Sequence, residues 1–136
     1  MKRFMFLLVG LLAASLAWGE VKVVYHLNEG ILQASRAMGN IRNHLDADPT
    51  VKIVVVTHGA GIDFLLDGAT NMAGVPFTGA IGELSGRGVE FLVCNNTLTG
   101  RKIDKNKVAM EAKVVPSGVA EVANLQAKQG FAYIRP

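Results

Sequence analysis

Residues 51–58 have the sequence VKIVVVTH, a nearly continuous run of β-branched apolar side chains in a chain of 136 residues. Strands that are covered on both faces have this composition, whereas strands with one wet face alternate apolar and polar residues. The run therefore predicts a central strand of a parallel sheet. Parallel neighbours need long crossover connections, which are usually helices, so helical segments are expected on either side of it.

The flanking sequence supplies these helices and further strands. Ile31, Ala34, Met38, Ile41 and Leu45 recur at spacings of three and four, which is one apolar face of a helix. Shorter helical patterns cover about 62–66, about 77–84 and the stretch between Ser117 and Gly130. Four more β-rich segments complete the strands, at residues 21–26, 89–93, 112–115 and 131–134. The alternation predicts one α/β domain, a three-layer α/β/α sandwich around a five-stranded, mainly parallel sheet.

Two polar residues are placed to begin helices. Asn28 precedes the first helical pattern and Ser117 precedes the last, and both residue types accept a hydrogen bond from the first free N–H groups of a helix. Each is predicted to be a helix cap.

The N-terminus has the pattern of a secretory signal peptide. A basic start at Lys2 and Arg3 is followed by an uncharged apolar run from Phe4 to Leu16, and small residues at Ala17 and Gly19 suit a signal peptidase. We expect residues 1–19 to be cleaved, leaving residues 20–136 as a single domain in the periplasm. A retained N-terminal membrane anchor is the alternative, although the run is short for a bilayer span of about 20 residues.

Charge argues against general nucleic-acid binding. Lys2 and Arg3 would leave with the signal peptide, so the formal net charge would fall by two, from +3 to +1. A nearly neutral domain lacks the basic surface that binds phosphate backbones. A local basic cluster remains, which is either a solvated loop or a surface that binds an anion or a partner. It consists of Arg101, Lys102, Lys105 and Lys107.

Three chemically active side chains follow the first three predicted strands. His26, His58 and Cys94 each stand at a strand's C-terminal end, and in open α/β sheets this edge is where ligands bind. Cys94 is the single cysteine, so it cannot form a disulfide within its own chain. A thiol at this edge, before the amides of a following helix, is placed to be a reactive thiolate. The alternative is a small buried apolar residue.

The chain resembles the DsrE/DsrF-like family over nearly all of residues 21–136. The resemblance is carried by four segments in order, VKVVYHL, VKIVVVTHGAGIDFLL, GVEFLVCNNTL and VVPSGVAEVANLQAKQGFAYIRP. It implies a five-stranded, mainly parallel sheet and a homotrimer or homohexamer. Related proteins of sulfur oxidation and transfer-RNA thiolation carry sulfur as a cysteine persulfide, and Cys94 matches the position of their active cysteine. Those carriers are cytoplasmic, whereas this chain has the features of an exported protein.

The resemblance suggests roles for the residues around Cys94. The backbone amides of Asn95, Asn96 and Thr97 are expected to favour the thiolate, because a helix N-terminus behaves as a partial positive charge. His58 is a candidate to pair with the thiol, or it only bonds backbone. Arg101 is a candidate to attract an anionic sulfur donor such as thiosulfate.

Two other classes of function remain open. His26, His58 and Cys94 could form a three-ligand copper or zinc site. The chain could also be a non-catalytic oligomer that binds a partner protein. No cofactor is expected. The persulfide hypothesis implies a sulfur donor and a sulfur acceptor as partners. Binding to nucleic acid is not expected, and neither is binding to a membrane once the signal peptide is cleaved.

Overall fold

A computed structural model of the chain describes residues 19–136. The predicted signal peptide lies outside the described residues except for Gly19. None of the helices within residues 19–136 has the length and apolar character needed to cross a membrane.

A five-stranded sheet forms the middle of the molecule. Its strands run β4-β3-β2-β1-β5 and every neighbouring pair is parallel, as the sequence predicts. The strand formed by the VKIVVVTH run, β2, is central. The strands are β1 (Lys22–Leu27), β2 (Lys52–Thr57), β3 (Glu90–Cys94), β4 (Ala112–Val115) and β5 (Ala132–Ile134).

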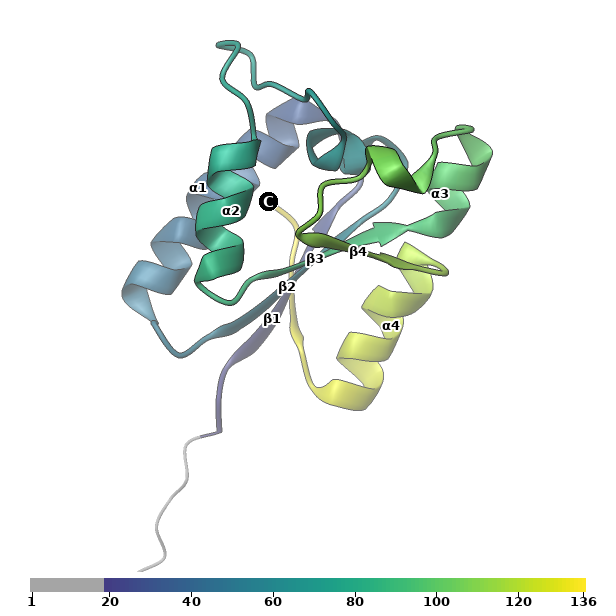
Figure 1. Cartoon of the computed structure of the whole chain (residues 1–136). Coiled ribbons are helices and arrows are strands. Elements are labelled where there is room, and N and C mark those ends of the chain that lie inside the picture. The colour runs from purple at the N-terminus through teal and green to yellow at the C-terminus, as the bar shows by residue number, and fades with distance from the viewer. Residues whose placement is uncertain (1–18) are drawn as a thin grey trace, which may run out of the picture.

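Helices cover both faces of the sheet, which confirms the predicted three-layer arrangement (Figure 1). In the figure α1 and α2 lie on one side of the strands and α4 on the other. The expected short helix near residues 62–66 is a 3₁₀ turn that begins earlier, directly after His58. The helices are α1 (Ile31–Ala47), α2 (Thr78–Gly86), α3 (Asn95–Gly100) and α4 (Gly118–Gln129), with 3₁₀ turns η1 (Gly59–Leu65) and η2 (Lys105–Lys107).

The two faces of the sheet have separate cores. Successive side chains of a strand point to opposite faces, so Val55 packs into the core on the α1 and α2 side while Val54 and Val56 pack toward α4. The core on the α1 side is the larger one and includes Phe64 and Phe91, whose rings meet edge to face. The core under α4 consists of Val24, Val54, Val56, Leu92, Val122, Leu125 and Phe131, with Val115 packed against it.

One of the two predicted helix caps is wrong. Gly30, not Asn28, precedes α1, and no side chain caps that helix. Gln33 reaches back instead, and its buried side-chain oxygen accepts hydrogen bonds from the backbone N–H groups of Asn28 and Glu29 at 3.0 and 2.8 Å. The side chain of Gln33, inside the first turn, therefore holds the segment that precedes the helix. This interaction takes the place of the cap expected at Asn28.

The cap of α4 is as predicted. Ser117 Oγ accepts a hydrogen bond from the Ala120 N–H at 3.3 Å, and Gly130 ends the helix in the left-handed conformation at φ 73°. This cap fixes where α4 begins, which matters for the site described next.

A glycine brings η1 against the end of β1. A Cβ atom at Gly61 would stand 2.1 Å from the Leu27 carbonyl oxygen, a distance that no side chain can adopt. The backbone N–H of His58 donates to the same carbonyl at 3.1 Å. Gly61 thus holds the segment after β2 tightly against β1, at the edge where the predicted site residues lie.

Candidate functional site

The three predicted residues lie on one face of the sheet, at its C-terminal edge. His26 and Cys94 belong to β1 and β3, and His58 directly follows β2. All three have even numbers, like Val24, Val54, Val56 and Leu92 of the α4-side core. Because side chains alternate along a strand, this shared parity places them on the α4 side.

Cys94 lies where two helices begin. The thiol is a free cysteine with an exposed fraction of only 4%. Burial raises the pKa of Cys94, but the Gly118 N–H, the Thr97 hydroxyl and the N–H groups of Thr97 and Asn96 lower it. Their combined effect is larger, so the pKa lies below its ordinary value. The direction agrees with the sequence-based expectation, and the contribution of Gly118 is new.

The Thr97 hydroxyl is held in a donating orientation. Its oxygen accepts a hydrogen bond from the Gly59 N–H at 2.9 Å, which leaves the hydroxyl proton available for the Cys94 sulfur. Asn95 contributes differently from the expectation, since its amide is not among the groups that lower the Cys94 pKa. Asn95 instead lines a small hollow of about 220 Å³ together with Lys105, Val114, Val115 and Pro116.

Gly118 joins His58 and Cys94. A Cβ atom on this glycine would stand 3.2 Å from the His58 Cβ, 3.2 Å from the Thr57 carbonyl oxygen and 3.3 Å from the Cys94 Cβ. The missing side chain lets the α4 backbone sit directly over the ends of β2 and β3. Sequence reasoning missed this residue, although the Ser117 cap already indicated that a helix begins there.

His58 pairs with His26 rather than with the thiol. The two Nε2 atoms are 2.7 Å apart, the ring centroids are 4.8 Å apart and the ring planes differ by 28°. If the two rings pointed at each other along one line, their centroids would be separated by the nitrogen–nitrogen distance plus one ring radius on each side. The observed centroid distance is close to that sum, so the rings meet nearly end to end. Burial lowers the pKa of both histidines, and in His26 the neighbouring His58 and Arg135 lower it further.

Tyr133 extends this pair and was not foreseen. Its hydroxyl lies 2.6 Å from the His26 Nδ1 atom, and its side chain is 41% exposed. Tyr133 stands on β5 beside Val24 of β1. No local pattern marks it, because residues 107 positions apart meet only through the placement of β5 next to β1.

Arg101 is engaged within the protein. Its Nη1 atom donates to the Asp63 carboxylate at 2.6 Å and to the Gly59 carbonyl oxygen at 3.1 Å. Both partners belong to η1, so Arg101 joins the segment after α3 to the segment after β2. An anionic ligand would have to share Arg101 with Asp63.

The geometry gives no support to a three-ligand metal site. Within residues 19–136, no group of three or more His, Cys, Asp or Glu side chains is arranged to hold a metal ion. The nearly in-line contact of the two imidazoles suits a shared proton.

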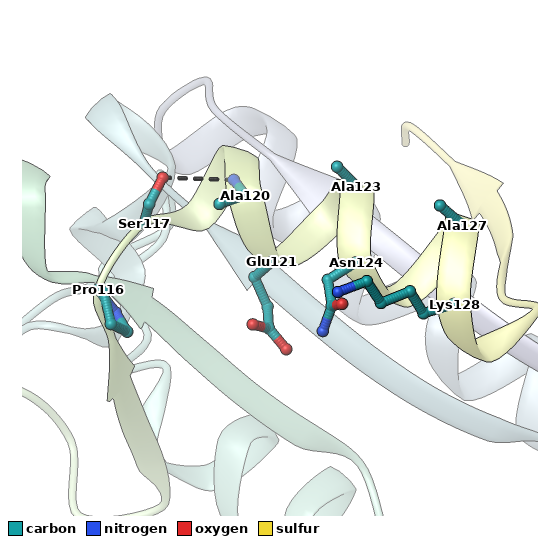
Figure 2. A pocket seen from close by; sticks show the side chains of 8 residues that line it. All are labelled: Pro116, Ser117, Ala120, Glu121, Ala123, Asn124, Ala127 and Lys128. Carbon is teal, nitrogen blue, oxygen red and sulfur yellow. Dashed lines mark hydrogen bonds between the residues drawn. The ribbon is translucent and has the colours of Figure 1, made fainter.

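A separate groove runs along α4 and contains none of the predicted site residues (Figure 2). It has a volume of about 560 Å³ and begins at Pro116 and Ser117, next to Gly118. Small alanine side chains and the polar groups of Glu121, Asn124 and Lys128 line it. The groove is open along the outer side of the helix, whereas the Cys94 sulfur lies beneath the start of that helix.

Taken together, fold and site define an all-parallel three-layer α/β protein with a thiol at the carboxyl edge of its sheet. A family model, the DsrE/DsrF-like family, matches residues 10–136, and the chain belongs to this family. No curated protein matches.

Two solved structures are similar to the chain. One is MTH1491 from Methanobacterium thermoautotrophicum, described as a protein of unknown function. It has a TM-score of 0.76 and 31% sequence identity, over 86% of this chain and all of that one. The ychN protein from E. coli has a TM-score of 0.67 over 86% of this chain and 98% of its own, and at 11% identity it supports the fold alone.

Proposed function

We propose that the protein is an exported sulfur-relay protein that carries sulfane sulfur as a persulfide on Cys94. One observation carries the proposal: donors from the starts of two helices converge on the single thiol and lower its pKa. Sulfur transfer begins with attack by a thiolate, and thiolate reactivity depends on such electropositive surroundings. Membership of the DsrE/DsrF-like family, which is sulfur-relay-like, supports the same chemistry.

Loading from thiosulfate illustrates the step. The Cys94 thiolate attacks the outer sulfur of thiosulfate, a sulfur–sulfur bond forms to Cys94, and the bond to the sulfonate group breaks with its electron pair. The products are the Cys94 persulfide anion and sulfite, so charge and atoms balance without an added oxidant. The Asn96, Thr97 and Gly118 N–H groups and the Thr97 hydroxyl lower the pKa of Cys94 and would stabilise negative charge on its sulfur. Arg101 is a candidate to bind the sulfonate if Asp63 shares it.

The burial of Cys94 shapes how donors and acceptors reach it. Because only 4% of Cys94 is exposed, a small sulfur compound can reach the thiol more easily than a donor protein can. Delivery to an acceptor protein would then follow movement of the α4 start, where Gly118 packs on the sulfur. This is consistent with a carrier that protects its persulfide from solvent between transfers.

Mass spectrometry of the purified chain tests the proposal. After incubation with thiosulfate or polysulfide, the intact protein should gain the mass of sulfur on Cys94, and Cys94→Ser should gain none. Native alkylation should show an inflection below the ordinary thiol pKa of about 8.5. A thiol that stays unreactive until the chain unfolds, with no sulfur gained, would contradict the proposal.

Export and assembly are part of the same proposal. Cleavage after Gly19 is tested by N-terminal sequencing of periplasmic protein, and full-length chain in the membrane fraction would overturn it. A homotrimer or homohexamer is supported by the family, whose members often oligomerise. Light scattering of the chain without residues 1–19 decides the assembly, and a monomer at micromolar concentration would count against it.

A non-catalytic, partner-binding oligomer is the second candidate. The observation that favours it is a set of large apolar side chains left exposed on the α1 side, namely Leu32 (61%), Met72 (77%) and Val75 (56%). Exposed apolar surface of this kind often marks an interface. An oligomer that carries no sulfur on Cys94 would support this candidate over the first.

A further inference from the structure

Tyr133, His26 and His58 form a continuous row of hydrogen-bonding atoms at the sheet edge. The contacts are 2.6 Å from the Tyr133 hydroxyl to His26 Nδ1 and 2.7 Å from His26 Nε2 to His58 Nε2. We call these three residues the Tyr–His–His row. It uses both ring nitrogens of His26 and leaves His58 Nδ1 as its inner end. Tyr133, the residue at its outer end, is 41% exposed.

His58, which carries the inner end of the row, follows β2 next to Cys94 at the end of β3. Gly118 packs against the Cβ atoms of both His58 and Cys94. His58 is half-buried, and among the described residues its Nδ1 atom has no protein hydrogen-bond partner. That nitrogen is therefore free to bind a water molecule or a ligand.

We propose that the Tyr–His–His row is a proton relay between the Cys94 thiol and solvent. A thiol with 4% exposure must release its proton to react and has little direct contact with water. Two neutral imidazoles joined through their Nε2 atoms share one proton, and such a pair can pass a proton along without gaining net charge. The inference rests on the proposed role of Cys94 as a nucleophile.

The proton transfers along the row balance at every step. At the start His58 Nε2–H donates to His26 Nε2, and His26 Nδ1–H donates to the Tyr133 oxygen. When Cys94 releases its proton to His58 Nδ1, directly or through one water, the Nε2 proton moves to His26. The His26 Nδ1 proton then moves to Tyr133, whose own hydroxyl proton passes to solvent. One proton has left the thiol, and the row ends with every hydrogen bond reversed.

The surroundings keep the row neutral and ready to accept. Burial lowers the pKa of both histidines, and the charges of His58 and Arg135 lower the pKa of His26 further. Cys94 adjoins His58 at the end of the neighbouring strand, and Arg135 itself is paired with Glu29 at 3.0 Å. A histidine that is uncharged at neutral pH can accept a proton, whereas an imidazolium cannot.

Stopped-flow reaction of the full chain with 4,4′-dithiodipyridine tests the relay. At reagent concentrations where the rate no longer rises, proton loss limits the reaction. At pH 7 this plateau rate should fall about 100-fold in His58→Gln and His26→Gln, within the range for lost acid–base catalysis. Tyr133→Phe should show a smaller loss, because water can replace the hydroxyl. Added imidazole should restore much of the rate in His58→Gln.

A matched control is present on the other face of the sheet. His44 Nδ1 lies 2.9 Å from the Tyr25 hydroxyl, a second His–Tyr contact that does not reach the thiol. His44→Gln should leave the plateau rate unchanged.

The results separate this inference from the proposed function. Row variants that react at the wild-type rate, a loss as large in His44→Gln, or a failure of imidazole rescue would overturn the relay. If the row variants react more slowly with the reagent but Cys94 of the unmodified chain takes up no sulfur, the relay is supported and sulfur carriage is overturned. If the row variants load sulfur normally and their plateau rates are unchanged, the relay is overturned and sulfur carriage is retained.

Discussion

The two faces of the sheet differ in how completely they are covered. The helices α1, α2 and α3 and the turn η1 cover the α1 side, where the larger core includes Leu98 of α3 and three aromatic rings in edge contact. A single helix covers the α4 side, and its core is small. All of the chemically active residues described above lie at the edge of this thinly covered face. The difference indicates that one face stabilises the domain while the other leaves room for a site.

The two His–Tyr contacts show the same contrast on a smaller scale. Tyr25 is 2% exposed, and burial raises the pKa of its hydroxyl. Tyr133 is 41% exposed and its histidine partner continues to a second histidine. The Tyr25–His44 contact is partly buried and ends there, whereas the Tyr133–His26 contact is exposed and continues to His58.

Gly61→Ala should cause the largest loss of stability. The new methyl group would collide with the Leu27 carbonyl oxygen, and backbone must move to make room. We expect about 3 kcal/mol or more of lost unfolding free energy, measured by urea denaturation. Gly39→Ala, where nothing lies within 4 Å of the new atom, is the control and should not destabilise. Equal midpoints for the two variants would contradict this account of the β1–η1 contact.

Val55→Ala and Val56→Ala test the comparison of the faces directly. Both side chains are fully buried on the same strand but belong to the α1-side and α4-side cores respectively. The cost of a cavity depends on how well its walls can relax. We expect a loss of about 2 kcal/mol for Val55→Ala and about 1 kcal/mol for Val56→Ala. A larger loss at Val56 would show that α4 packs as rigidly as the other layer.

Acid should destabilise the protein through His26 and His58. Both have a pKa below the unfolded value of about 6.5, so the unfolded chain binds more protons as the pH falls. Their contribution is fully present above pH 6.5 and is lost as the pH falls from there through the folded pKa values. The melting temperature should drop by a few degrees between pH 7 and 5.5. A His26→Asn, His58→Asn double variant should lose most of this dependence, and an unchanged slope in it would refute the assignment.

Arg101→Gln should have the smallest effect on stability. Its ion pair with Asp63 is partly exposed, and such pairs contribute about 0.5 kcal/mol. The same variant sharpens the view of the site. If Arg101 only joins η1 to the end of α3, the thiosulfate concentration for half-maximal loading of Cys94 stays unchanged. A clear rise in that concentration, with stability nearly retained, would assign Arg101 to ligand binding.

Much of the architecture follows from local sequence. The VKIVVVTH run, the apolar helix spacing and the Ser117 and Gly130 helix ends are short-range signals, and the structure confirms each of them. The boundaries of the predicted strands agree with the observed ones to within one residue. The Asn28 cap fails because α1 begins two residues later, after Gly30, and Gln33 inside the helix binds the backbone N–H groups of Asn28 and Glu29 instead.

The sequence by itself determined the parallel sheet and the strand ends at which His26, His58 and Cys94 stand, because these depend on residue type and on the pattern of apolar residues along the chain. That the three side chains share the α4 face depends on the register between strands, which the structure supplied. Only the tertiary structure decided that Gly118 lies against His58 and Cys94, that Tyr133 reaches His26 and that Asp63 engages Arg101. Each of these contacts joins segments far apart in the chain. They arise from the strand order, which places β5 beside β1 and carries α4 back over β2 and β3, and no local pattern of residues encodes that order.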